Sequence, residues 1–286
     1  MARRRPIALL ALLAFASLSF AQAKPTVDVD VVYGKAGDKE LKLDIARPTE
    51  EKGPFPCVVC YHGGGWRSGN KRDLRPWIEH LATQGYVGVS VGYRLAPDAI
   101  FPAQIEDAKT AIRFLRTSAA KYDVDKDHFA AMGWSAGGHL VCLIGLTDEK
   151  AGFDGKEYSK ESSKVQAVVD YFGPTDLSGY AKDQLAQKGM LGPFIGAKYA
   201  DNPAAHDKAS PIKYVTKDAP PFLIFQGTKD WIVPIEQSRS LAAKLKDVGV
   251  PVKLVEVEGE GHGWEGKSVN ETTRETIKFL GERLKK

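Results

Sequence analysis

Six nearly continuous apolar runs recur along the chain, and helical patterns separate most of them. The runs are PCVVCYHG, YVGVSVGY, HFAAMGW, VQAVVDYFG, PFLIFQG and VKLVEVEG. Continuous apolar runs of this length suit strands that are covered on both faces. Helical periodicity covers approximately residues 74–84, 105–119, 136–146, 236–248 and 271–284. The alternation predicts an α/β fold with a mainly parallel central sheet and helices on both faces.

Two earlier segments, VDVDVVYG and ELKLDIARP, alternate apolar and polar residues. This alternation predicts half-buried antiparallel strands at the N-terminal edge of the sheet. Residues 177–220 break the pattern with Gly, Pro, Lys and Asp, and they are too many for an ordinary connection. We therefore expect one domain over residues 24–286 with a small cap or lid inserted at 177–220.

The first 23 residues differ from the rest of the chain. A cationic start, MARRRP, precedes the apolar run IALLALLAFASLSF and the small residues AQA. This order predicts a secretory signal peptide cleaved near Ala23, with an uncleaved N-terminal anchor as the alternative. The expected location is secreted or periplasmic, with no stable membrane span after cleavage.

An exported chain makes its cysteines relevant, and there are three, Cys57, Cys60 and Cys142. Cys57 and Cys60 lie three positions apart in an apparent buried strand, so their side chains should point to opposite faces and not pair. All three are interpreted as buried thiols, with a bridge from Cys142 to one of the others as the alternative.

Charge is balanced along the chain. The net charge of +4 comes from 40 basic and 36 acidic residues without a long basic run, which excludes a nucleic-acid-binding surface as the main feature. The histidines show no metal-ligand spacing such as H-E-x-x-H, and we expect neither a metal nor a cofactor.

Chemically reactive side chains follow the ends of the apolar runs. Ser135 lies within GWSAG, where small neighbours permit a sharp turn; Asp230 follows LIFQG, and His262 follows LVEVEGEG. Ligands bind at the carboxyl ends of strands in open parallel sheets. Ser135 as nucleophile, His262 as base and Asp230 as the carboxylate that orients the imidazole form a complete catalytic set. Asp170 and Asp176, near another strand end, are the alternative acids.

The order Ser, Asp, His and the G-x-S-x-G string are similar to those of the α/β-hydrolase fold. With the strings HGGGW, GYRLAP, FPAQIEDA, ASPI, PPFLIFQGTKD and GEGHGW, nearly the whole mature chain resembles hormone-sensitive-lipase-like and feruloyl-esterase-like (BD-FAE-type) serine carboxylesterases. The resemblance implies an oxyanion hole made by the N–H groups of Gly64, Gly65 and Ala136.

Other aromatic and imidazole side chains lie near these strings. We expect His139 to pack beneath the Ser135 turn, His62 to shape the glycine loop, and His80, His128 and His206 to be structural or on the surface. Four tryptophans neighbour the catalytic strings and are candidates for a pocket that takes a planar or sugar-linked acyl group, with core packing as the alternative; they are Trp66, Trp134, Trp231 and Trp264.

The sequence thus predicts a secreted serine ester hydrolase that forms an acyl-enzyme. The expected partners are short-chain acyl esters, or acetyl and feruloyl esters of plant cell-wall polysaccharide. A serine peptidase of the same fold is one alternative. A non-catalytic carbohydrate-binding protein on a hydrolase scaffold is the other, although this chain retains every triad and oxyanion residue.

Overall fold

The computed structural model describes residues 24–49, 52–180 and 190–285. The predicted signal peptide, residues 1–23, and residues 181–189 of the predicted cap lie outside this part. None of the helices within it is long and apolar enough to cross a membrane.

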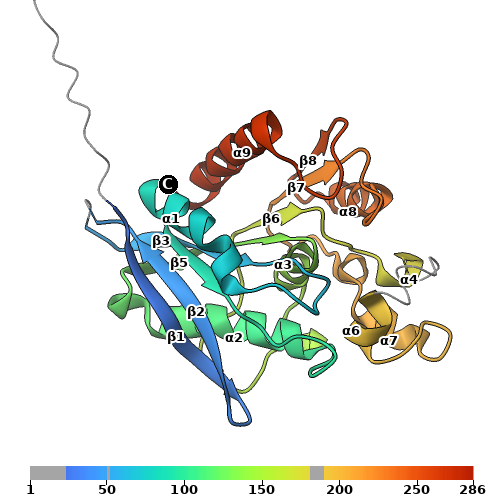
Figure 1. Ribbon diagram of the computed structural model, residues 1–286, viewed down its shortest axis with the longest axis horizontal. Coiled ribbons are helices and arrows are strands. Elements are labelled where there is room, and N and C mark those ends of the chain that lie inside the picture. The colour runs from blue at the N-terminus through green and yellow to red at the C-terminus, as the bar shows by residue number, and fades with distance from the viewer. Residues whose placement is uncertain (1–23, 50–51, 181–189, 286) are drawn as a thin grey trace, which may run out of the picture.

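An eight-stranded sheet runs through the centre of the described chain (Figure 1). Its order is β1-β2-β4-β3-β5-β6-β7-β8, with β1 and β2 antiparallel to their neighbours and the remaining pairs parallel. The strands are β1 (Thr26–Ala36), β2 (Lys39–Arg47), β3 (Phe55–Tyr61), β4 (Val87–Val91), β5 (Val124–Trp134), β6 (Ala167–Tyr171), β7 (Phe222–Gly227) and β8 (Val252–Val257). The predicted parallel sheet with an antiparallel N-terminal edge is confirmed.

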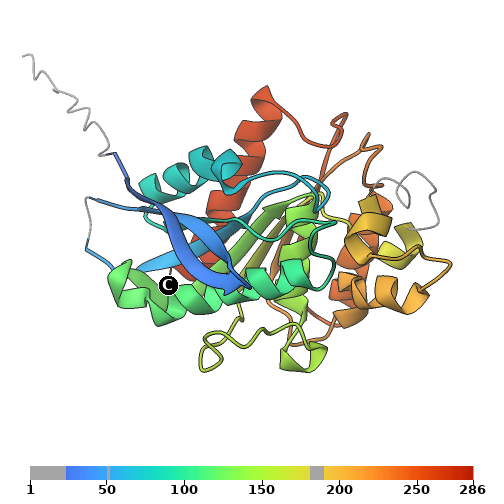
Figure 2. The same ribbon diagram turned by 60° about the horizontal axis from the view of Figure 1, so that its bottom comes forward.

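Helices cover both faces of this sheet, as predicted (Figure 2). The long helices are α1 (Arg75–Thr83), α2 (Ala103–Thr117), α3 (Ala136–Leu146), α8 (Glu236–Asp247) and α9 (Gly266–Leu284). Apolar residues of α2, α3 and α8 pack on one face, and those of α1 and α9 pack on the other. The last helix begins at Gly266, five residues before its predicted start. The prediction missed the first turn, GKSVN, because that turn has no apolar periodicity.

The central strand β3 shows why its residues form a sheet covered on both sides. Cys57 and Val59 pack against the α2 side, whereas Val58 and Cys60 pack against the α1 side. The two cysteines therefore point to opposite faces, as their spacing predicts. All three cysteines of the chain are free buried thiols, which excludes the alternative bridge to Cys142.

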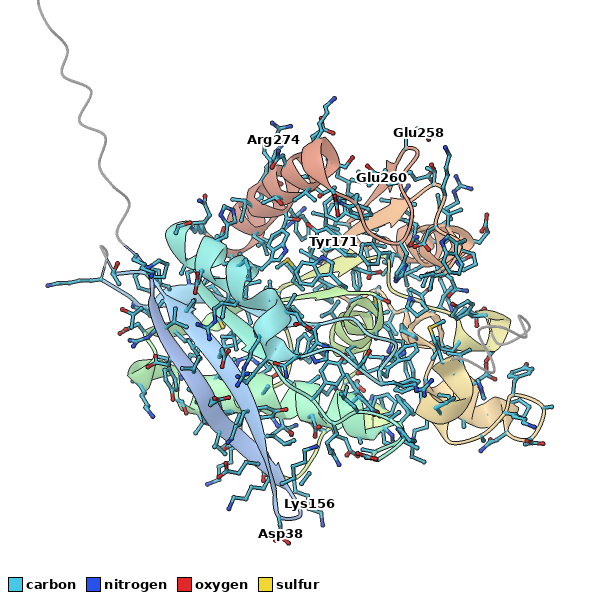
Figure 3. All side chains as sticks on the ribbon, in the orientation of Figure 1. Asp38, Lys156, Tyr171, Glu258, Glu260 and Arg274 are labelled. Carbon is cyan, nitrogen blue, oxygen red and sulfur yellow. The ribbon has the colours of Figure 1, made fainter. Side chains whose placement is uncertain are left out.

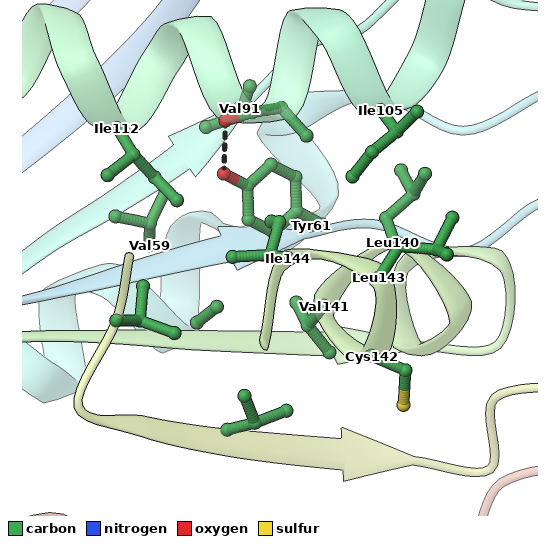
Figure 4. Close-up of a cluster of buried hydrophobic side chains, with 14 of the residues drawn as sticks. Val59, Tyr61, Val91, Ile105, Ile112, Leu140, Val141, Cys142, Leu143 and Ile144 are labelled. Atoms are coloured by element: carbon green, nitrogen blue, oxygen red, sulfur yellow. Dashed lines mark hydrogen bonds between the residues drawn. The ribbon is translucent and has the colours of Figure 1, made fainter. Parts of the chain in front are cut away.

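Tyr61 ends β3 inside the larger of the two hydrophobic clusters (Figure 4). Its ring is fully buried beside Ile105, Ile112 and Leu140, and its hydroxyl donates to the Ala108 carbonyl at 2.9 Å. Burial removes this hydroxyl from water, so without the Ala108 carbonyl it would have no hydrogen-bond partner, which is energetically costly. The tyrosine therefore joins the end of β3, where the glycine loop begins, firmly to α2.

Residues 177–220 connect β6 to β7 beside the carboxyl ends of the strands. Their described part forms short helices: α4 (Leu177–Tyr180), α6 (Gly192–Ile195), α7 (Pro203–Lys208) and a 3₁₀ helix, η5 (Pro211–Tyr214). The break in apolar periodicity corresponds to this chain of short turns. Two 3₁₀ helices, η1 (Lys71–Leu74) and η2 (Ala119–Lys121), flank α1 and α2, and η3 (Glu149–Ala151) follows α3.

Candidate active site

Ser135 occupies the turn between the end of β5 and the start of α3. Its φ of 53° and ψ of −116° place it in a region that side-chain-bearing residues rarely adopt. Its N–H donates to the Tyr171 carbonyl at 2.8 Å, and its carbonyl accepts from the His139 N–H at 2.9 Å. These two bonds fix the strained residue between β6 and the first turn of α3.

Glycines flank Ser135 because the turn leaves no room for side chains. A Cβ on Gly133 would lie 2.3 Å from the Gly137 carbonyl oxygen, and a Cβ on Gly137 would lie 2.0 Å from the Tyr61 carbonyl oxygen. Both distances are far shorter than any van der Waals contact. Glycine is thus required at positions 133 and 137 because the backbone of α3 and of the end of β3 lies too close for a side chain.

Tyr171, which receives the Ser135 N–H, is itself held in the interior. In Figure 3 its ring lies under α9, while Arg274 on that helix and Glu258 after β8 point outward. The Tyr171 hydroxyl pairs with Thr276 Oγ1 of α9 at 2.8 Å. The end of β6 is therefore fixed to α9, and with it the turn that carries Ser135.

Three of the predicted catalytic side chains meet at the carboxyl end of the sheet. Ser135 Oγ lies 2.9 Å from Nε2 of His262, and Nδ1 of His262 lies 2.7 Å from Oδ2 of Asp230. The His262 side chain is 15% exposed, whereas the Asp230 side chain is fully buried. A hydroxyl, an imidazole and a carboxylate in this chain of hydrogen bonds form the arrangement of a nucleophile, its base and an orienting acid.

The Asp230 carboxylate is held by further hydrogen bonds. Its Oδ1 accepts the N–H groups of Ile232 and Val233, each at 2.9 Å. Its Oδ2 accepts from Gln226 Nε2 at 2.8 Å, in addition to His262. Donors directed at both oxygens keep the carboxylate pointed at the imidazole.

Gln226 is a site residue that the sequence analysis missed. It is fully buried on β7, and its Oε1 accepts from the Ser238 hydroxyl of α8 at 2.8 Å, which turns the NH₂ group toward Asp230. A second bond from Nε2 reaches the Val233 carbonyl at 3.1 Å. Its position four residues before Asp230 in FQGTKD is the signal that the sequence contained.

Neither alternative acid pairs with His262. The Asp170 carboxyl is fully buried at the end of β6, where Oδ1 accepts the Gly173 N–H at 2.9 Å and burial raises its pKa to about 7. Oδ1 of Asp176 accepts the Gly179 N–H at 2.9 Å and caps α4. Asp230 is thus the carboxylate that the fold brings to the imidazole.

The glycine loop lies between the end of β3 and η1. Gly64 and Gly65 have φ values of 111° and 59°, which favour glycine. The Gly64 carbonyl accepts the N–H groups of Arg67 and Ser68, which closes the loop into a turn. Among the described residues, no backbone hydrogen bond of a turn, loop or cap uses the N–H group of Gly64, Gly65 or Ala136 as its donor. These N–H groups remain the predicted oxyanion donors.

The four candidate tryptophans differ in exposure. Trp66 is 1% exposed, so its indole lies within the core and has no open surface for a substrate. Trp231, next to Asp230, is 76% exposed. Trp134 and Trp264 are half-buried, and Trp264 packs edge-on against Phe172 at 5.2 Å. Since Phe172 also contacts the His262 ring at 4.7 Å, Trp264 belongs to the wall beside the base.

The remaining histidines are placed as expected. His139 is fully buried on α3 beneath Ser135, and burial lowers its pKa to about 4. His62 is buried, stacks on Tyr93 at 4.3 Å and begins the glycine loop. The others lie away from the triad: His206 is buried on α7, and His80 and His128 are half-buried.

A hollow of about 430 Å³ opens beside the glycine loop. Gly64, Gly65, Ala96, Pro97 and Met190 are among its lining residues. A larger hollow of about 1000 Å³ lies at the opposite end of the sheet, next to Gln166 and Pro221 at the amino ends of β6 and β7. The smaller hollow adjoins Gly64 and Gly65, two of the three predicted oxyanion donors.

Known proteins resemble this chain in both sequence and structure. Esterase LipC of Mycobacterium tuberculosis is 34% identical over 244 residues, which are 82% of this chain and 59% of LipC, so the chain spans less than two thirds of that relative. A truncated carbohydrate esterase from gut microbiota superposes with a TM-score of 0.77 at 28% identity, covering 93% of this chain and 99% of the other.

A thermophilic esterase of Thermogutta terrifontis, described as Est2 with propionate bound, gives a TM-score of 0.74 at 29% identity and covers 92% of this chain and 94% of its own. The family described as BD-FAE matches residues 43–245, from within β2 to within α8. These findings agree with the observed fold. The chain belongs to the BD-FAE family and has the α/β-hydrolase fold.

Proposed function

We propose that this protein is a serine carboxylesterase in which Ser135, His262 and Asp230 form the catalytic triad. The observation that carries the proposal is the continuous hydrogen-bonded chain from Ser135 Oγ through His262 to Asp230. In the first step His262 Nε2 accepts the hydroxyl proton while Oγ attacks the ester carbonyl carbon. The resulting imidazolium then protonates the leaving alcohol, which leaves an acyl group on Ser135.

Deacylation repeats the sequence with water as the nucleophile. His262 accepts a proton from water, the hydroxide attacks the acyl carbon, and Ser135 departs with the returned proton. In both steps negative charge develops on the carbonyl oxygen. The N–H groups of Gly64, Gly65 and Ala136 are proposed to stabilise it, together with the positive end of α3, which begins immediately after Ser135.

The proposed substrates are short-chain acyl esters, or acetyl and feruloyl esters on plant cell-wall polysaccharide. The related structures support this range, because one is described as a carbohydrate esterase and another as an esterase with propionate bound. The hollow of about 430 Å³ beside the glycine loop has room for a small acyl group. Exposed Trp231, directly after Asp230 in the chain, is proposed to offer an aromatic face to a sugar or feruloyl ring.

A substrate panel tests the proposal. Purified protein is assayed with p-nitrophenyl acetate and butyrate, methyl ferulate, acetylated xylan and aminoacyl anilides, and Ser135→Ala is the matched control. We expect turnover of at least one ester class, no cleavage of the anilides, and no turnover by the variant. A fluorophosphonate probe should label the wild-type protein at Ser135 and leave Ser135→Ala unlabelled. Anilide cleavage in place of ester cleavage would support the peptidase alternative.

We also propose export, with removal of residues 1–23. The cationic start, the apolar run and the AQA site support it. Expression of the full chain with an epitope at its C-terminus, followed by fractionation and N-terminal sequencing, tests it. The expected product lies outside the cytoplasm and begins near Lys24, and a retained full-length chain would contradict cleavage.

A further inference from the structure

Trp66, directly after the two glycines of the predicted oxyanion hole, has a φ of 59°. A bulky residue in this left-handed region is strained, and such strain persists only where the surroundings determine the conformation. The Trp66 carbonyl accepts the Ala96 N–H at 2.8 Å, and its indole stacks on Phe194 at a centroid distance of 4.1 Å. The backbone and the side chain are thus both held.

A third contact joins this indole to the helix that carries the nucleophile. Trp66 Nε1–H donates to Nδ1 of His139 at 3.2 Å, and both side chains are buried. His139 is one helical turn after Ser135, and its N–H donates to the Ser135 carbonyl. The hydrogen bond therefore connects the glycine loop to the helix that carries the nucleophile through two side chains.

The imidazole of His139 is fixed at its other nitrogen as well. Nε2–H donates to the Ala209 carbonyl at 2.7 Å, which leaves Nδ1 as the acceptor that the indole requires. Burial lowers the pKa of His139 to about 4, so the ring is neutral at neutral pH and keeps this tautomer. Ala209 and Phe194 both belong to the segment inserted between β6 and β7, so this segment braces both members of the pair.

Gly64 and Gly65 have no side chains with which to fix their own N–H groups. The loop is anchored at its start, where the Tyr93 hydroxyl donates to the His62 carbonyl at 2.8 Å. At its other end Trp66 directly follows Gly65, and the Ser68 hydroxyl donates to the Gly64 carbonyl at 3.1 Å. An oxyanion donor must lie within about 0.5 Å of its productive position, so the anchors at this end affect the donor geometry, and the buried indole of Trp66 is the one that reaches the helix carrying Ser135.

We propose that the hydrogen-bonded pair Trp66 and His139 positions the oxyanion donors Gly64 and Gly65 relative to Ser135. This inference rests on the proposed esterase function and adds two positioning residues to it. Breaking the pair should weaken transition-state stabilisation while leaving substrate binding and the Ser135–His262–Asp230 chain in place. We therefore expect kcat to fall, while KM and the pH profile of the activity stay unchanged.

Three variants separate the two bonds of His139. His139→Asn places Oδ1 where Nδ1 stood, so it retains an acceptor for Trp66 and loses the bond to Ala209. His139→Gln extends an NH₂ group toward the Ala209 carbonyl and loses that acceptor position. Trp66→Phe keeps the stack on Phe194 and removes the donor. His128→Gln is the control, because His128 pairs with Asp125 at 2.8 Å at the amino end of β5.

Each protein is assayed with p-nitrophenyl butyrate below its melting temperature, and an aliphatic trifluoromethyl ketone serves as the oxyanion-forming inhibitor. Because losing one oxyanion donor costs about 10²–10³ in kcat, displaced donors in His139→Gln and Trp66→Phe should cost about 10- to 100-fold. KM should change less than about threefold, and inhibitor affinity should fall in parallel with kcat/KM. His139→Asn should lie nearer the wild-type protein, and the double variant Trp66→Phe/His139→Gln should lose no more than the worse single variant.

Other results would overturn the proposal. If Trp66→Phe and His139→Gln retain the kcat of His128→Gln, the pair does not position the donors. If His139→Asn loses as much kcat as His139→Gln, the loss does not follow the bond to Trp66. If His139→Asn loses more than His139→Gln, the bond to Ala209 is responsible. A shifted pH profile would place the damage at His262. Absence of esterase turnover and probe labelling in the wild-type protein would instead refute the proposed function itself.

Discussion

Nε2 of His262 lies 2.9 Å from Oγ of Ser135, although 127 residues separate the two along the chain. The two residues follow β8 and β5, which are not neighbours in the sheet. β6 and β7 lie between them, and the residues after β8 must return across the sheet to reach the serine. This return brings His262 past Asp230, which follows β7, and places the imidazole between carboxylate and hydroxyl.

The first prediction concerns the orienting acid. Asp230→Asn should lower kcat by a factor on the order of 10⁴, the loss that the wrong imidazole tautomer causes in serine proteases. Asp176→Asn should leave kcat almost unchanged, because an amide oxygen can still accept the Gly179 N–H. Steady-state kinetics and circular dichroism of both variants provide the measurement. The reverse ranking of the two variants would reassign the acid.

The second prediction concerns Gln226. Gln226→Met preserves the length of the side chain but removes the donor to Asp230 Oδ2. Because a hydrogen bond to a charged group contributes about 1.5–3 kcal/mol, we expect kcat to fall by roughly 10- to 100-fold. Gln166→Met is the matched control, since Gln166 accepts the Phe129 N–H at 2.7 Å at the other end of the sheet. The control should lose stability and keep its kcat, and equal kcat values for the two variants would contradict a role for Gln226.

The third prediction uses the glycines around Ser135. A Cβ at position 137 would lie 2.0 Å from the Tyr61 carbonyl oxygen, so Gly137→Ala must displace either the turn or β3. We expect a loss of more than about 2 kcal/mol in the free energy of unfolding and a fall in kcat of at least about 100-fold. In Gly281→Ala the nearest atom is the Tyr86 hydroxyl oxygen at 3.8 Å, so this helical substitution should be tolerated. Urea unfolding and kinetics of both variants compare them, and a fully active Gly137→Ala would refute the steric explanation.

The fourth prediction concerns pH and stability. Burial raises the pKa of Asp170 from 3.8 in the unfolded chain to about 7 in the folded protein. The folded state therefore binds this proton more tightly, and the stabilisation is fully present below pH 3.8 and lost as the pH rises toward 7. Between these limits the group makes the wild-type protein less stable by up to about 1.4 kcal/mol for each pH unit.

Asp170→Asn carries a neutral side chain at every pH and should lack this dependence. The measurement is the free energy of urea unfolding at several pH values between 4.5 and 7, taken as the difference between wild type and variant. Asp218→Asn, an exposed substitution before β7, is the control and should follow the wild-type curve. Parallel curves for wild type and Asp170→Asn would show that Asp170 is ionised in the folded protein throughout this range.

Local patterns in the sequence determined the sheet, its helices and the chemical groups at the strand ends. Continuous apolar runs such as PCVVCYHG depend only on burial of both faces, and the spacing of Cys57 and Cys60 follows from the two-residue period of a strand. The glycines beside Ser135 are similarly a local steric requirement. For these features the physical cause lies within a few residues of its effect.

The tertiary structure decided which distant groups meet. It paired His262 with Asp230 and left Asp170 and Asp176 with other partners, buried Trp66 against His139 while exposing Trp231, and added Gln226 as a support for the acid. No local pattern predicts the pairing of His262 with Asp230 or of Trp66 with His139, because in each pair the two residues lie on segments separated by at least one strand and one helix. The distances between these side chains and their burial are set only when the whole sheet is assembled. Packing therefore decides which of several aspartates or tryptophans reaches a given partner.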